Sequence, residues 1–189
     1  MLEGSEIRLR PIEPEDIEIL WRFWTDVEAV SLVSNSPPKP VTLDEFKTLF
    51  EELGQKDDQI RFVIEVGGEV VGDCVLHSLD KHNRFCEVGI LLGKPHWSKG
   101  YGQQALSLLV DFAFMHNNMH RVGLEVLADD ERAVGCYLKV GFVEEGRLRK
   151  RDWVNGAYHD VMVMSILDEE WSGNAVVEPE QRVASRHYL

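Results

Sequence analysis

The stretch Pro95-His96-Trp97-Ser98-Lys99-Gly100-Tyr101-Gly102 lies between two segments of different hydrophobic period. The segment before it, Cys86 to Leu92, is apolar and ends at Gly93-Lys94-Pro95, which cannot continue a strand ladder. The segment after it, from Gly102 to about Asn117, repeats apolar residues with the period of a helix. Where a strand is followed by glycines and then by a helix, the first N–H groups of the helix have no hydrogen-bond acceptor. The positive end of the helix dipole lies at the same place. The sequence therefore predicts a phosphate-binding loop here.

Other interpretations of these glycines exist. Gly100-x-Gly102-x-x-Ala105 also matches a dinucleotide-binding fingerprint, with Glu125 placed as a ribose-binding acid. That fold needs repeated parallel units, whereas an antiparallel meander precedes this loop and only one strand with a short helix follows it. No Gly-Lys-Ser/Thr closes the run, so it is not a P-loop. A plain turn between strand and helix stays open as an alternative.

The N-terminal part predicts one strand and two helices. Residues 7–10 alternate apolar and charged, which indicates a strand, and Pro14 lies where a helix can start. Residues 31–40 hold three prolines and an asparagine, and form a predicted loop. Thr42 and Glu45 make a capping box, which starts the second helix.

The remaining pattern completes one domain. Strands are predicted at 61–66, 69–79 and 86–92, the first two joined by a Gly67-Gly68 turn. The long helix is followed by a strand around 122–126, a short helix at 131–140, and strands near 142–149 and 157–166. The order is βααβββαβαββ. We expect a single α/β (α+β) domain with a mostly antiparallel sheet of about seven strands.

Composition narrows the class of partner. The chain has 189 residues and a formal net charge of −13, which argues against binding to nucleic acid or to anionic membranes and favours cationic acceptors. No basic region followed by an apolar run begins the sequence, and no run of eighteen apolar residues occurs, so we expect a cytoplasmic protein. The cysteines and histidines show no metal-ligand spacing, and no metal is predicted.

Two separated blocks resemble the GNAT superfamily of N-acetyltransferases, especially its ribosomal-protein and spermidine acetyltransferase-like branch. The first block is residues 95–102, which is similar to the family's acetyl-CoA loop, with Trp97 where Gln or Arg is frequent. The second is residues 130–142, similar to Asn-x-x-Ala-x-x-x-Tyr-x-Lys-x-Gly-Phe, with Asp130 at the asparagine position. Asn155-Gly156-x-Tyr158 is also typical of this branch. The resemblance implies a GNAT domain over 1–171 and a polar tail at 172–189.

The resemblance also implies a site that uses acetyl-CoA as cosubstrate. Tyr137 matches the family's general acid, although a core tyrosine is the alternative, and Glu87 is the candidate base, directly or through water. His77 is a weaker candidate base, and Cys136 is assigned to the core. The implied cofactor-binding residues are Ile90, Leu91, Leu92, Trp97, Ser98, Lys99, Gly100, Tyr101, Gly102, Gln103 and Asp130.

The implied reaction is direct attack of a primary amine on acetyl-CoA in a ternary complex. The amine is that of a protein N-terminus, a polyamine or a small molecule, and a non-catalytic acyl-CoA-binding regulatory domain is the alternative. The acceptor site is expected between residues 31–40, the N-terminal helices and residues 147–158. Its candidate lining residues are Phe23, Trp24, Trp153 and Tyr158, and a basic run at 147–151 is either a solvated strand end or a binder of anionic groups. A homodimer is compatible with the sequence.

Overall fold

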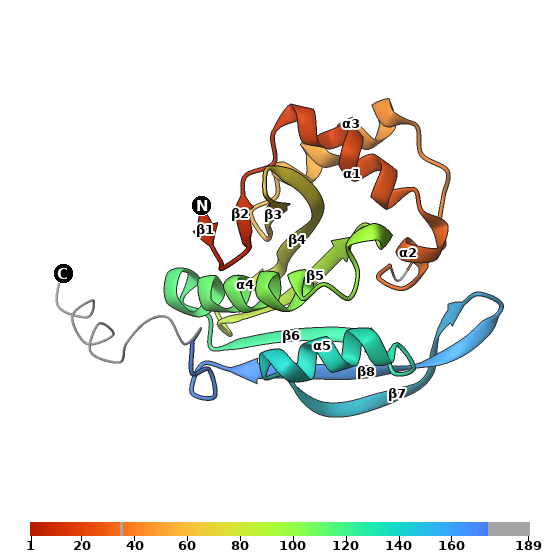
Figure 1. The fold of residues 1–189 in the computed structure, drawn as a ribbon. Helices are drawn as coiled ribbons and strands as arrows, with labels where there is room; N and C mark the ends of the chain where they lie inside the picture. The colour runs from red at the N-terminus through yellow and green to blue at the C-terminus, as the bar shows by residue number, and fades with distance from the viewer. Residues whose placement is uncertain (35, 174–189) are drawn as a thin grey trace.

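The computed structural model describes residues 1–34 and 36–173, in which helices cover parts of both faces of an eight-stranded sheet (Figure 1). The strands are β1 (Leu2–Glu3), β2 (Ile7–Arg10), β3 (Ile60–Val66), β4 (Glu69–Asp80), β5 (Phe85–Leu92), β6 (Arg121–Leu127), β7 (Val143–Val154) and β8 (Ala157–Leu167). The helices are α1 (Ile17–Trp24), α2 (Val27–Ser31), α3 (Leu43–Gly54), α4 (Tyr101–Asn117) and α5 (Glu131–Val140), with 3-10 turns η1 (Pro14–Asp16) and η2 (Lys94–His96).

The predicted fold class is confirmed, and the element count needs two corrections. The sheet has eight strands and not seven, because the two-residue β1 pairs with β2 and is too short to show a pattern. Three helices, and not two, precede β3. Asp26 starts the additional helix α2, since its side chain accepts hydrogen bonds from the N–H groups of Glu28 and Ala29 at 3.1 and 3.2 Å. β7 also runs on to Val154 through irregular pairing that the sequence pattern did not show.

The strand order β1-β2-β3-β4-β5-β6-β8-β7 contains one parallel pair, β5 with β6. That pairing covers only three positions and ends at Glu87 opposite Gly123. Beyond it, β5 continues beside β4 and β6 beside β8, so the two halves of the sheet diverge (Figure 1). Residues 88–92 therefore have a strand partner on one side only, and backbone groups on the other side are left for a ligand.

On one face of the sheet, helix α4 crosses the gap between the two diverging halves. Its residues Leu106, Leu109 and Val110 are at most 1% exposed and belong to a core that includes side chains from both halves of the sheet. Each fully buried side chain of this kind contributes about 1.5–3 kcal/mol. This packing holds the halves in place where no strand pairing joins them.

Helices α1 and α3 cover part of the opposite face, over β3 and β4. The predicted capping box at the start of α3 is confirmed: the Thr42 hydroxyl accepts from the Glu45 N–H at 3.3 Å, and the Glu45 carboxylate accepts from the Thr42 N–H at 2.8 Å. The Trp24 indole donates to buried Asp73 at 2.7 Å, which fixes the end of α1 on β4. These contacts place α2 beside the open end of β5 (Figure 1).

Candidate active site

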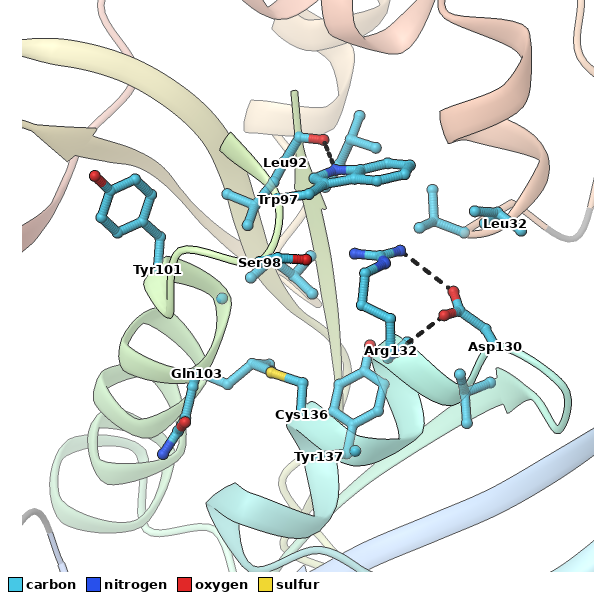
Figure 2. A pocket seen from close by; sticks show the side chains of 18 of the residues that line it. Leu32, Leu92, Trp97, Ser98, Tyr101, Gln103, Asp130, Arg132, Cys136 and Tyr137 are labelled. Carbon is cyan, nitrogen blue, oxygen red and sulfur yellow. Dashed lines mark hydrogen bonds and ion pairs between the residues drawn. The ribbon is translucent and has the colours of Figure 1, made fainter. Parts of the chain in front are cut away.

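A cavity of about 450 Å³ lies where β5 and β6 separate. Figure 2 shows it bounded by the loop after β5, the first turn of α4, and α5. All the predicted cofactor-binding residues line it except Lys99, and Tyr137 lines it as well. The lining residues that were not among the predicted cofactor-binding residues include Ala29, Leu32, Val33, Val88, Gly89, Glu125, Val126, Arg132 and Ala133.

The loop before α4 has the backbone geometry of an anion site. Ser98 and Gly100 both have left-handed φ values, +59° and +84°. Gln104 donates the first backbone hydrogen bond of the turn, to the Gly100 carbonyl at 3.1 Å. In the described part of the chain, the N–H groups of residues 98–103 have no acceptor. These donors and the positive end of the α4 dipole favour a phosphate group.

Trp97 and Arg132 close one side of this loop. The Trp97 indole N–H donates to the Leu92 carbonyl oxygen at 2.7 Å and ties the loop to the end of β5 (Figure 2). The Arg132 guanidinium lies 4.1 Å from the centroid of the indole ring, a cation–π contact. Lys99, one of the predicted cofactor-binding residues, does not line the cavity, whereas Arg132 does. The available sequence signal was the place of Arg132 in the first turn of α5, inside the second block.

Asp130 has both carboxylate oxygens engaged. One accepts from the Ala133 N–H at 3.0 Å and caps α5, and the other lies 3.3 Å from the Arg132 guanidinium. Asp130 is thus the N-cap residue of α5. Arg132 also offsets the negative charge, so an aspartate here is compatible with an anion in the neighbouring loop.

Tyr137 projects from α5 toward the middle of the cavity (Figure 2). Its ring packs edge-on against Phe142, with centroids 5.8 Å apart. No group in residues 1–34 or 36–173 hydrogen-bonds to the hydroxyl, which lies free in the cavity. Burial, followed by the neighbouring Cys136 and Asp130, raises the pKa of Tyr137 well above its ordinary value. The phenol therefore stays protonated at neutral pH, the form that a general acid needs.

Cys136 is a partial exception to its predicted core position. The thiol touches the core but is only half-buried, and it lines the cavity. Burial raises the pKa of Cys136, so the neutral thiol predominates. A neutral thiol is a weak nucleophile, which does not favour an acyl-cysteine step.

Glu87, the predicted base, lies at the last paired position of β5 and β6, where the two strands begin to diverge. It is not among the residues that line the cavity. Its carboxylate accepts a hydrogen bond from the Ser78 hydroxyl at 3.0 Å. His77, opposite Glu87 on β4, places Nδ1 3.1 Å from that hydroxyl and 3.5 Å from the carboxylate. The two candidate bases are therefore parts of one cluster.

The predicted acceptor residues are brought together only in part. Leu32 and Val33 line the cavity, whereas Phe23, Trp24, Trp153 and Tyr158 are not among its lining residues. Trp153 and Tyr158 pack on each other at the tip of the β7–β8 hairpin and are 63% and 61% exposed.

The basic run on β7 also lies away from the cavity. Arg147 pairs with Glu144 at 2.7 Å, and Arg151 pairs with Glu125 on β6. None of residues 147–151 lines the cavity. These two ion pairs favour a structural role for those members of the run.

No group of three or more His, Cys, Asp or Glu side chains in residues 1–34 and 36–173 could hold a metal ion. Within the same residues, no helix is long and apolar enough to cross a bilayer.

Comparison with known proteins gives consistent results. Residues 6–143 match the family profile described as acetyltransferase (GNAT) domain. The chain is 27% identical to the spermidine N(1)-acetyltransferase of Vibrio cholerae over 169 residues, 89% of this chain and 96% of that protein. It is 34% identical over 183 residues to YdaF of Bacillus subtilis (strain 168), provisionally named a ribosomal N-acetyltransferase, covering 90% of this chain and 96% of YdaF.

A solved structure is similar over nearly the same range. The crystal structure of spermidine N-acetyltransferase from Vibrio cholerae in complex with CoA and spermine aligns with a TM-score of 0.82 at 27% identity. The alignment covers 88% of this chain and 98% of that one.

Proposed function

Because the chain belongs to the GNAT family of acetyl-CoA-dependent N-acetyltransferases, we propose that it acetylates a primary amine of a small polycation such as a polyamine. The observation that carries this proposal is the cavity between β5 and β6, which has an anion-binding loop at one end and carboxylates beside it. The net charge of −13 raises the local concentration of polycations. The similarity to spermidine acetyltransferases supports the same class of acceptor.

Acetyl-CoA is expected to bind in this cavity. Free N–H groups of residues 98–103 are placed to hold a pyrophosphate, with Arg132 as the nearby cation. On the side away from β4, residues 90–92 have no strand partner. Apart from the Leu92 carbonyl, which accepts from Trp97, their main-chain groups on this side are available to an extended pantetheine arm. Gly100 suits this loop, because its left-handed φ of +84° is less favourable for a residue with a side chain.

We assign the reaction to direct attack of the amine nitrogen on the acetyl carbon, without an acyl-enzyme. The carbon–nitrogen bond forms as the carbon–sulfur bond breaks, and the leaving sulfur needs a proton. Tyr137 is the donor, since its hydroxyl is protonated, unpartnered and directed into the cavity. Removal of a proton from the ammonium form of the amine falls to the cluster of His77, Ser78 and Glu87.

Calorimetric titration followed by an acceptor screen tests the proposal. Acetyl-CoA and CoA are expected to bind and to raise the melting temperature, whereas NAD(H) is not. Thiol release is then measured with spermidine, spermine, peptides with free N-termini and small monoamines. A polyamine with the highest kcat/KM supports the proposal. A preference for peptide N-termini contradicts the acceptor class, and binding of acetyl-CoA with no turnover of any amine contradicts the enzymatic function.

A further inference from the structure

We propose that His77 is the general base that deprotonates the acceptor amine, and that Glu87 positions it through the Ser78 hydroxyl. This inference rests on the proposed acetyl transfer and names the residue that performs its first proton transfer. It changes the role expected of Glu87 from base to positioning residue.

The hydrogen bonds assign the tautomer of His77. Ser78 has one hydroxyl hydrogen, which it donates to the Glu87 carboxylate at 3.0 Å. The same oxygen lies 3.1 Å from His77 Nδ1 and must therefore accept from it. The proton then resides on Nδ1, and Nε2 carries a free lone pair. Within the described part of the chain, Nε2 has no hydrogen-bond partner, so it is available to take a proton.

His77 does not line the cavity, but its free nitrogen lies beside Gly89, a lining residue without a side chain. A Cβ atom built on Gly89 would lie 3.9 Å from His77 Nε2. Gly89 itself lines the cavity, directly after the point where β5 and β6 separate. Cys86 and Val88 face the α4 core, so strand alternation puts Glu87 and Gly89 on the opposite face. We therefore expect an amine that enters from that face to pass Nε2 on its way to the cavity.

The backbone at Ser78 is irregular, and the irregularity directs the Ser78 hydroxyl. Ser78 has a φ of +53°, in the left-handed region, and the β4–β5 register shifts between His77 and Asp80. A left-handed conformation is unfavourable for a residue other than glycine. The irregularity turns the Ser78 hydroxyl to the face that holds His77 and Glu87, where regular alternation would point it away.

The surroundings favour the neutral imidazole. Burial lowers the pKa of His77 below its ordinary value, and Arg61 on β3 acts in the same direction. Glu87 on β5 and Asp58 before β3 oppose this shift without reversing it. Arg151 on β7, which pairs with Glu125, also interacts electrostatically with Glu87. At neutral pH, His77 is therefore in the form that accepts a proton.

Each proton that is transferred in this reaction has a donor and an acceptor. Nε2 takes one proton from the ammonium group, and the amine lone pair then attacks the acetyl carbon. Tyr137 gives its proton to the departing sulfur and regains one from the newly acylated nitrogen. The products are an amide, a free thiol and one proton, which His77 releases to solvent.

The test uses His77→Gln with His82→Gln as its matched control, because His82 is an exposed histidine in the turn after β4. Acetyl-CoA affinity is measured first and is expected to be unchanged in both. With a polyamine acceptor, His77→Gln is expected to lower kcat about 10²- to 10⁴-fold, the usual contribution of general base catalysis. With an amine of pKa about 7, already largely neutral, the loss is expected to be less than about tenfold. An equal loss with both amines, or no loss, overturns the proposal.

Two further variants test the positioning role. Glu87→Gln removes the negative charge that raises the pKa of His77, so the acidic limb of the kcat/KM profile is expected to move to lower pH. Ser78→Gly deletes the hydroxyl and relieves the left-handed backbone, and it is expected to lower kcat while raising the melting temperature. If the acidic limb of the kcat/KM profile does not move in Glu87→Gln, the proposal that Glu87 acts on His77 through Ser78 is wrong. Failure of wild-type turnover with every amine would instead contradict the proposed function.

Discussion

The guanidinium of Arg132 lies 4.1 Å from the centroid of the Trp97 ring, and it joins the two sequence blocks of the site, which are separated by a helix and a strand. Trp97 is held by the Leu92 carbonyl, and Arg132 by Asp130. A tryptophan in place of a polar loop residue therefore does not leave the anion site without a side-chain cation. Instead, the Trp97 ring packs against the guanidinium of Arg132.

Replacement of Arg132 by methionine is expected to weaken acetyl-CoA binding about 3- to 10-fold. The change removes the cation–π contact and leaves the Asp130 charge uncompensated beside the loop. Isothermal titration calorimetry measures the effect, with Arg149→Met on exposed β7 as the control. Equal affinities in the variant and the wild type would show that Arg132 does not serve the cofactor.

Asp130→Ala is expected to destabilise the protein by about 1 kcal/mol, because the Ala133 N–H loses its cap. For a chain of this size, that corresponds to a fall of about 2–4 °C in melting temperature. Asp130→Asn keeps a side-chain acceptor and is expected to melt with the wild type. It also frees Arg132, so its acetyl-CoA affinity should equal or exceed that of the wild type. Equal destabilisation by both variants would mean that the charge, and not the cap, matters.

Tyr137→Phe is expected to lower kcat about 10²- to 10⁴-fold while the Kd for acetyl-CoA changes less than about twofold. Phenylalanine keeps the edge-on packing against Phe142, so folding is preserved. Because burial raises the pKa of Tyr137, the wild-type kcat should not decline up to about pH 10, the ordinary value for tyrosine. Tyr158→Phe at the exposed hairpin tip is the control. Full activity in Tyr137→Phe would assign this tyrosine to packing alone.

The network around Arg10 predicts loss of stability in acid. Arg10 bonds Glu65 and Asp16, each at 2.6 Å. The Arg10 hydrogen bond holds the pKa of Glu65 below its ordinary value, although burial opposes it. A lowered folded pKa gives stability that is present above the ordinary pKa, about 4.3, and that is lost as pH falls through the folded value.

Arg10→Met tests this network by urea unfolding between pH 7 and pH 3. The variant is expected to lose about 3 kcal/mol at pH 7 and to depend less on pH below about 5. Arg22→Met, which breaks an exposed pair with Glu18, is expected to lose about 0.5 kcal/mol or less. An unchanged pH dependence in Arg10→Met would assign acid sensitivity to other carboxylates.

Much of the site could be predicted from local patterns. The helical period after Gly102 and the capping box at Thr42 depend on residues a few positions apart, and both are found in the structure. The two family blocks likewise located the loop at 95–102 and Tyr137 in one cavity. Asp26 was a local signal for the start of α2. The helix has only five residues, which is too short for a pattern of apolar residues to reveal it.

What the sequence alone determined is therefore the identity of most elements, the glycine-containing loop between β5 and α4, and the family of the chain. Tertiary structure decided where β5 leaves β6, that Arg132 rests on Trp97, and that Ser78 bridges His77 to Glu87. Periodicity and capping arise from interactions within one or two turns, so they are visible along the chain. Register, bulges and contacts between distant elements depend on the packing of the whole sheet, and no short window of sequence contains that information.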